Sequence, residues 1–386
     1  MTAVSNVLIV GGGIAGQTLG CALAKRGIAC EIVEVMRDWA ISGTAMTIHG
    51  NALRAFHDIG VVDDIVAASW HRPSRPIVFT DAQGEVIFEP EDPNVVGPGY
   101  PAMVAVRRQL LHEILTRAVA RAKVPVRMGT TVDALNETGS GVEVTFSDGT
   151  RRGYDLVVGA DGIRSKVRAL TFGNIEPQLA GFGSWRAILP RPKALEVMIW
   201  MWGKGKTLGL LPVSDDLVYF AGVTKEETKV RYRQEDLPRL FPEKFGSFGG
   251  LVPEVMASIS SPDQLLFTAM EEVKLPPPWF KGRVVVLGDA AHAATPFWAQ
   301  GAAMAIEDSI LLAQLLEKHT QLTACLEEWM GRRYDRCMFV QEGSYQTGRQ
   351  IHRDAEDDKP KVFPPPVREA LKAEAARRSA RLAEPI

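Results

Sequence analysis

The first 35 residues carry an apolar pattern that predicts a strand, a helix and a second strand. Residues 6–10, "NVLIV", are a short β-branched run typical of a buried parallel strand. Residues 14–26 are small and apolar at helical spacing, and residues 29–35, "ACEIVEV", have the pattern of the next strand. Together they predict one β-α-β unit.

Two further helices are expected before residue 123. Residues 51–67 favour one helix, and residues 108–122 favour another. The second helix has a clear apolar face, formed by Leu111, Ile114, Leu115 and Val119. The segment between the two helices, up to about residue 102, is rich in proline and poor in strand signals.

The pattern then changes to short alternating strands. Residues 142–150, "VEVTFSDGT", predict part of a hairpin that leads into a strand within 154–162. From about residue 182 to 267, apolar strands separated by turns indicate an antiparallel sheet. Helices return after residue 301. The tail from residue 354 is charged and ends in an Ala/Arg/Glu-rich helix, with disorder or loose packing as the alternative for this segment.

These elements predict an α/β protein with a Rossmann-like domain, an inserted antiparallel sheet and C-terminal helices. We expect the Rossmann-like domain to be discontinuous, with residues 1–175 and 268–350. The inserted sheet takes residues 176–267, and residues 351–386 form a charged C-terminal tail or helix.

Composition and charge exclude several classes of protein. The chain has 386 residues and is 46% hydrophobic, so it can bury a large core. Its formal charge is only −2. Without a basic block, nucleic acid is not the expected partner. No stretch reaches the roughly 18 apolar residues that span a bilayer, so no transmembrane segment is expected. The apolar start lacks a basic region and is broken by glycines, so it is not a signal peptide.

The four cysteines show no C-x-x-C pair and lie in apolar contexts; they are Cys21, Cys30, Cys325 and Cys337. We expect buried, reduced thiols in a cytoplasmic protein.

A glycine motif follows the first strand and opens the first helix. Gly11, Gly13 and Gly16 have G-x-G-x-x-G spacing, which allows a tight turn and lets a pyrophosphate approach the helix start. Glu34 ends the second strand, where a carboxylate accepts hydrogen bonds from a ribose diol. The alternatives are a tight turn without a ligand for the glycines and a solvated strand end for Glu34. Because the glycine motif and Glu34 occur together at the spacing of a dinucleotide-binding unit, they favour dinucleotide binding.

Two more motifs narrow the type of cofactor. They are "LVVGADGIRSKVR" at 156–168 and "GRVVVLGDAAHAATPFWAQGAAMAIED" at 282–308. With "GGGIAG" at 11–16, they make residues 6–345 resemble the single-component FAD-dependent aromatic hydroxylases of the p-hydroxybenzoate hydroxylase fold. Within that family, the chain looks most similar to the salicylate, alkylquinolone, urate and hydroxynicotinate hydroxylases.

The resemblance implies a set of FAD contacts. Asp289 would hold the ribityl chain, Pro296 to Gly301 would line the flavin, and the helix start at Gly301 and Ala302 would face its pyrimidine edge. At the glycine motif, the expected contacts include Ile14 and Ala15.

Two further residues of the family motifs, Asp161 and Arg108, are cofactor candidates with an alternative each, and His292 is weighed as a base. Asp161 is implicated in FAD and pyridine nucleotide handling, with Arg168 as the basic member of its motif, or it is only a helix N-cap. Arg108 would reach the cofactor, or it is only a solvated helix residue. His292 follows "DAA" and is mainly structural in the family, although its chemistry would suit a base. No metal-ligand spacing is present, and we expect no metal.

The implied reaction is a hydroxylation. NADH or NADPH reduces FAD, O2 forms a flavin C4a-hydroperoxide, and one oxygen passes to a phenolic or hydroxylated N-heteroaromatic ring. Arg186 and Tyr219 are the polar candidates for the substrate pocket, with Pro296, Phe297 and Trp298 from the flavin side.

Other aromatic and apolar candidates lie on the inserted sheet, namely Trp185, Trp200, Trp202 and Leu210. Only about half of the sheet candidates can face one side, because side chains alternate along a strand.

The chain departs from the family at several positions. Ala40 stands where arginine is common, and Ala45 and Ala299 stand where glycine is common. Trp298 is large for a residue beside the flavin. These changes affect the shape of the flavin channel.

Related flavoprotein reductases or halogenases, and a flavin-binding protein without turnover, are the alternatives. The W-x-W-x-I-P motif of halogenases is absent. The assembly would be a monomer or a homodimer.

Overall fold

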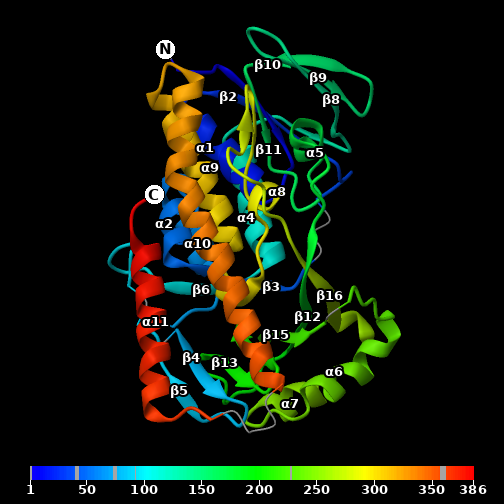
Figure 1. Cartoon of the computed structure of the whole chain (residues 1–386), viewed down its shortest axis with the longest axis vertical. Helices are drawn as coiled ribbons and strands as arrows, with labels where there is room; N and C mark the ends of the chain where they lie inside the picture. Colours follow the sequence, from blue (N-terminus) through cyan, green and yellow to red (C-terminus); the bar gives the residue numbers. More distant parts are fainter. Residues whose placement is uncertain (1, 40–42, 73–75, 92, 227, 357–361) are drawn as a thin grey trace.

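The computed structural model describes residues 2–386, apart from 40–42, 73–75, 92, 227 and 357–361. Figure 1 shows two regions stacked along the long axis of the molecule. One contains a parallel sheet with its helices. The other contains a second sheet with α6 (Leu237–Phe245) and α7 (Val252–Ala257) beside it.

The first region is built on a six-stranded sheet. Its order is β17 (Phe280–Lys281), β18 (Val284–Val286), β11 (Leu156–Gly159), β1 (Asn6–Val10), β2 (Ala29–Glu34) and β7 (Val126–Met128). All neighbours are parallel except β17 and β18. Strands β1, β11 and β18 are buried along almost their whole length, which explains why their sequences are apolar runs without alternation.

Helices pack around this sheet. They are α1 (Ile14–Lys25), α2 (Gly50–Asp58), α3 (Val62–Ala67), α4 (Arg108–Arg121), α5 (Lys166–Phe172), α8 (Asp289–His292), α9 (Gly301–Lys318) and α10 (Leu322–Glu356). The 35-residue α10 runs from this region down to the second sheet (Figure 1). Among the described helices, none is long and apolar enough to cross a bilayer.

The structure also contains two small sheets and three short 3-10 helices among the described residues. One sheet pairs β3 (Ala45–His49) with β6 (Met103–Arg107), and the other contains β8 (Val132–Glu137), β9 (Val142–Phe146) and β10 (Arg151–Tyr154). The 3-10 helices are η1 (Gln234–Asp236), η2 (Pro262–Gln264) and η3 (Pro296–Trp298).

The second region is built on a seven-stranded sheet. Its order is β16 (Leu265–Glu272), β12 (Gln178–Pro190), β15 (Leu217–Lys225), β14 (Lys206–Pro212), β13 (Met198–Gly203), β4 (Ile77–Asp81) and β5 (Val86–Phe88). One face packs on α6 and α7 and buries an aromatic core that includes Trp185, Phe220 and Phe245.

The fold class is the predicted one, but two local predictions were wrong. The helix expected at 51–67 is two helices, because Gly60 adopts a left-handed φ of +69° between them. The segment expected to be poor in strands contains β4 and β5. Strand β4 pairs in parallel with β13, so residues 77–88 belong to the second sheet although they precede it by about 100 residues of sequence.

The C-terminal tail ends in a helix, as predicted, and the alternative of loose packing does not hold for that helix. Helix α11 (Pro365–Ala383) lies along the molecule from β5 to α2 (Figure 1). Phe363, Ala375 and Leu382 are buried. Arg336 donates to the Arg381 and Leu382 carbonyls, and Arg54 donates to those of Ala383 and Glu384. These guanidinium groups satisfy carbonyls that a helix end leaves unpaired.

Candidate active site

The turn between β1 and α1 is shaped by glycines. Gly11 has a φ of +111°, and a Cβ there would lie 2.4 Å from the Ala160 carbonyl oxygen. A Cβ on Gly16 would lie 1.9 Å from the Gly11 carbonyl oxygen, so the helix and the strand can pack this closely only with glycine.

The start of α1 is open. A Cβ on Gly13 would meet nothing within 4 Å, and the helix begins without a side-chain cap or an acidic residue in its first turn. The half-buried Ile14 and Ala15 are its first two residues. Their backbone N–H groups are among those without an intrahelical partner, and together with the helix dipole they favour an anion.

Glu34 lies directly beside this turn. One carboxylate oxygen accepts from the Gly12 N–H at 2.7 Å, and the other accepts from the Met36 N–H at 2.9 Å. The carboxylate therefore holds the glycine turn in shape. Binding of a ribose by Glu34 stays a prediction.

Asp289 lies where α1 and α9 converge. A Cβ on the preceding residue, Gly288, would lie 2.9 Å from Ala305 Cβ on α9 and 3.7 Å from Ala15 Cβ on α1. The start of α9 at Gly301 and Ala302 has no side-chain cap or first-turn acid, and a Cβ on Gly301 would meet nothing within 4 Å. Two open helix starts and one carboxylate thus face the same region.

Asp289 is an exposed residue, although many protein atoms lie around its carboxyl group. Burial raises its pKa above the ordinary value, and the positive charges of His292 and Arg108 oppose this. Arg108 begins α4, and its side chain covers Gly43, where a Cβ would lie 2.8 Å from Arg108 Cδ. The positive charge of its guanidinium also contributes to lowering the pKa of Arg186 and opposes the rise in the pKa of Tyr219, both on the seven-stranded sheet. Arg108 therefore stands between the two regions.

These residues fit FAD. A dinucleotide needs a glycine turn that its pyrophosphate can approach, uncapped helix starts for anionic groups and carboxylates for its hydroxyl groups. All three are present, with the open surface at Gly13 and Gly301 and the accessible carboxylate of Asp289.

Asp161 organises the start of α5. Its carboxylate accepts from the Ser165 hydroxyl at 2.5 Å and from the backbone N–H groups of Lys166 and Val167 at 2.7 and 3.0 Å. Burial raises its pKa, and these hydrogen bonds oppose the rise. The capping role is therefore present, and a cofactor contact by Asp161 stays a prediction.

Arg168, in the same motif, is buried, and its guanidinium donates to the backbone carbonyls of Ala290, Ile163 and Ile175. It ties α5 to α8. The structure thus gives Arg168 a structural role.

One row of residues crosses the seven-stranded sheet on the face opposite α6 and α7. Arg186 on β12 pairs with Ala221 on β15, Ala221 with Gly209 on β14, and Gly209 with Trp200 on β13. A Cβ on Gly209 would lie 2.6 Å from the Trp200 ring, so the indole lies across the glycine. Ala221, and Gly209 beneath the indole, therefore form a low floor beside the guanidinium.

Arg186 has unused hydrogen-bonding capacity. One terminal nitrogen donates to the Thr268 hydroxyl at 2.7 Å, while Nε is buried without a partner in the described part of the chain. Burial lowers the pKa of Arg186, and Tyr219 opposes this. Tyr219 lies on the same face; burial raises its pKa, and Arg186 opposes the rise.

The remaining sheet candidates divide by strand alternation, as expected. Trp185 and Leu210 point to α6 and α7 and belong to that core. Trp200 and Trp202 lie on the other face, where Trp202 packs with Phe79, Phe88 and Phe363.

Trp298 packs against the C-terminal helices, and a substrate contact by its ring stays a prediction. Its indole is 9% exposed and donates to the Thr347 hydroxyl of α10 at 2.9 Å. Arg378 of α11 stacks over the ring, 5.1 Å from its centroid. Phe297 packs edge-on against Phe182 of β12, with centroids 4.9 Å apart. A proline-induced kink at Pro296 was visible in the sequence, but the direction of the side chains after it was not.

Sequence reasoning missed a buried charge network behind Asp289. Arg333 donates to Asp308 and to Glu307, both at 2.7 Å, and Arg336 donates to Glu307 at 2.8 Å. His292 lies 2.7 Å from Asp308. The adjacent acids in the apolar helix of residues 301–318 could have signalled this, because buried charges require partners.

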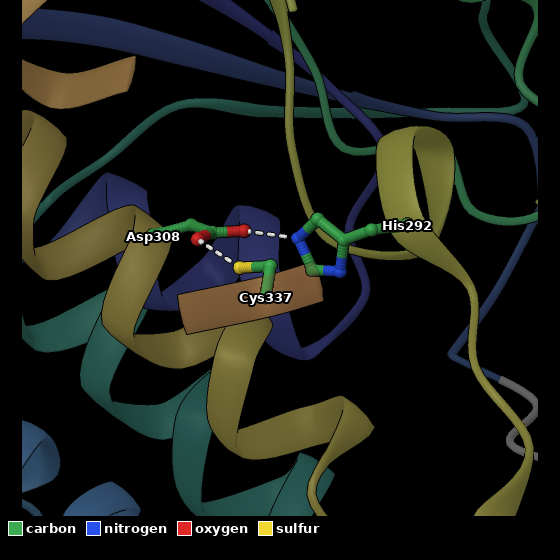
Figure 2. A group of neighbouring side chains, drawn as sticks. All are labelled: His292, Asp308 and Cys337. Carbon is green, nitrogen blue, oxygen red and sulfur yellow. Dashed lines mark hydrogen bonds and ion pairs between the residues drawn. The ribbon is translucent and has the colours of Figure 1, made fainter. Parts of the chain in front are cut away.

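His292, Asp308 and Cys337 lie close together (Figure 2), with their ligand atoms within 4.8 Å of one another. The Arg333 guanidinium also donates to the Asp308 carboxylate of this cluster. Although burial disfavours the charge of His292, Cys337 and Asp308 outweigh this and hold its pKa well above the ordinary value. The contacts of His292 and Arg333 with the Asp308 carboxylate make the cluster part of a buried ion-pair network.

All four cysteines are buried and free. Burial raises the pKa of Cys21 to about 11 and those of Cys30 and Cys325 to about 12. The predicted burial of the thiols is confirmed at all four positions. Ala40 lies outside the described residues, so its effect on the site is not visible.

Comparison with known proteins identifies the family. The model of the FAD binding domain family matches residues 4–327. An aurachin C monooxygenase/isomerase from Stigmatella aurantiaca is 31% identical over 347 residues, or 89% of each chain. The 2-heptyl-3-hydroxy-4(1H)-quinolone synthase of Pseudomonas aeruginosa is 31% identical over 349 residues, also 89% of each chain.

A solved structure shows the same fold. The HpxO protein of Klebsiella pneumoniae, in complex with FAD and uric acid, superimposes with a TM-score of 0.83 at 23% identity, covering 98% of this chain and 97% of that one. With the glycine turn, Asp289 and the two open helix starts in place, the chain belongs to the FAD binding domain family and is an FAD-dependent aromatic-ring monooxygenase.

Proposed function

We propose that the protein hydroxylates a flat phenolic or hydroxylated N-heteroaromatic substrate that carries a negative oxygen, with NADH or NADPH and O2 as cosubstrates. The observation that carries this proposal is the unpartnered, buried Nε of Arg186 beside the Ala221 and Gly209 floor. A buried N–H without an acceptor is costly, and an anionic ligand oxygen would satisfy it.

The floor suits a planar ring. Ala221 projects only a methyl group from the sheet, with Arg186 on one side of it and the Trp200 indole, which covers Gly209, on the other. An aromatic ring placed there would contact the indole and direct its acidic substituent toward the guanidinium. The relative named for a 4(1H)-quinolone and the neighbour that binds uric acid support an N-heteroaromatic substrate.

Each residue then has one task. Arg186 binds and orients the substrate oxygen, and Tyr219, whose raised pKa keeps it protonated, donates a hydrogen bond on the same face. The positive charge of Arg186 would lower the pKa of a bound phenol and so favour the phenolate. The ring of a phenolate is more electron-rich than that of the neutral phenol. Bound FAD supplies the hydride acceptance and the activation of O2.

FAD would be held by the residues around the first sheet. The glycine turn and the starts of α1 and α9 would bind its anionic groups, and Glu34 and Asp289 its hydroxyl groups; Arg108 would add positive charge near the flavin. Residues 1–175 and 268–350 would supply this domain, with 77–88 reassigned to the substrate domain of residues 176–267. Four free buried cysteines support a cytoplasmic location. The assembly would be a monomer or homodimer.

A panel of phenols and hydroxylated N-heterocycles tests the proposal. NAD(P)H oxidation is followed with each compound, and products are identified by mass spectrometry. A compound that speeds NAD(P)H oxidation and gains 16 mass units per oxygen atom supports hydroxylation. Reduction without oxygen insertion, halide incorporation or FAD binding without turnover across the panel would each contradict it.

A further inference from the structure

We propose that Trp298 is a positioning residue for the flavin: its indole, held by α10 and α11, keeps the loop between η3 and α9 in a strained conformation that aims the start of α9 at the cofactor. The inference rests on FAD binding and is independent of the substrate.

Strain in this loop is located at Ala299. Its φ of +51° and ψ of +31° place a residue with a Cβ in the left-handed region. Only Lys123 shares a positive φ among the described non-glycine residues. Such a conformation is unfavourable for alanine and persists only where the surroundings impose it. Ala299 directly precedes Gln300, the N-cap of α9, so its conformation sets the direction of that helix start.

Both neighbours of Ala299 are anchored. Before it, the Trp298 N–H donates to the Ser344 hydroxyl at 3.3 Å and the Trp298 indole N–H donates to Thr347 at 2.9 Å. After it, the buried side-chain amide oxygen of Gln300 accepts from the Asn51 side chain of α2 at 3.1 Å. The strained residue is thus fixed from two helices, α10 and α2.

Helix α10 is adapted to the indole. A Cβ on Gly343 would lie 2.0 Å from the Trp298 ring, so the ring occupies space that any other residue would fill. Glycine inside a helix destabilises it by about 1 kcal/mol relative to alanine, and here it admits the indole. Phe339 and Arg378 close the ring from the remaining sides. Gly331 lies on the same helix, and a Cβ there would meet nothing within 4 Å.

This pair of glycines gives a matched test. Both substitutions to alanine favour the helix, but only Gly343→Ala displaces the indole. We expect Gly343→Ala to weaken FAD binding to the apoprotein by at least about fivefold, the factor that corresponds to the strain at one left-handed alanine. Gly331→Ala should leave the Kd for FAD unchanged. Equal values for the two variants would overturn the proposal.

A rescue separates positioning from general packing. Trp298→Ala should weaken FAD binding and change the visible circular dichroism of the bound flavin. Adding Ala299→Gly removes the strain that Trp298 has to impose, so the double variant should regain about fivefold in affinity and the original spectrum. Failure of Ala299→Gly to improve FAD affinity in the Trp298→Ala background would contradict the proposal. Should Trp298→Ala not fold, Thr347→Val removes the indole hydrogen bond alone, and the same rescue is measured there.

Discussion

His292 and Asp308 form a buried ion pair, with the imidazole Nε2 2.7 Å from the carboxylate. Asp308 also accepts from the Gly288 N–H at 3.0 Å, one residue before the candidate FAD ligand Asp289. The pair therefore connects α8 to α9 directly behind the cofactor site. Its surroundings raise the pKa of His292 and lower that of Asp308.

We expect His292→Gln to destabilise the protein most near pH 6, by about 3–5 kcal/mol. A raised pKa means that the histidine stabilises the fold fully below its unfolded value of about 6.5, and that this contribution is lost as the pH rises through the folded pKa. The difference between wild type and variant should therefore shrink toward pH 9. Urea unfolding with saturating FAD between pH 5 and 9 measures it.

His319→Gln is the matched control for this experiment. His319 lies 2.8 Å from Glu328 at the surface, where an ion pair contributes about 0–1 kcal/mol. A loss in His292→Gln that grows with pH would contradict the charged state assigned to His292.

Asp289→Ala should weaken FAD binding by about 1.5–3 kcal/mol, because it removes charge-assisted hydrogen bonds to the cofactor. Asp215→Ala, at a fully exposed carboxylate, should have no effect. Fluorescence titration of the apoproteins with FAD gives both dissociation constants. Retention of wild-type affinity in Asp289→Ala would exclude Asp289 from the cofactor site.

Arg186→Gln should lower kcat/KM for an anionic aromatic substrate about 10- to 100-fold, since a hydrogen bond to a charged group contributes about 1.5–3 kcal/mol. FAD affinity should not change. Steady-state kinetics with the substrate found in the panel, beside FAD titration, distinguishes the two effects. An unchanged kcat/KM would show that the substrate oxygen does not bind Arg186. The assignment as an oxygenase would not be affected.

Leu382→Ala should destabilise the protein by about 2–3 kcal/mol, because Leu382 of α11 is 5% exposed and its loss leaves a cavity. Val362→Ala, at a residue 71% exposed, should change the free energy of unfolding by less than about 0.5 kcal/mol. Denaturant unfolding of both variants makes the comparison. Equal, small effects would mean that α11 is loosely attached.

Local patterns determined much of the cofactor region. The run of residues 6–10 with Gly11, Gly13 and Gly16 specifies a strand, a turn and a helix start within one short segment, because the spacing itself sets the backbone geometry. Strand alternation likewise determined that Trp185 and Arg186 point to opposite faces of their sheet.

The tertiary structure decided which of those faces meets the cofactor region, and it decided every long-range contact. Strand β4 joins β13, Arg336 binds the end of α11, and Gly343 receives the Trp298 indole, all between segments distant in sequence. None of these contacts leaves a periodic signal, because each depends on the packing of whole elements and on the need of buried charges and strained residues for partners.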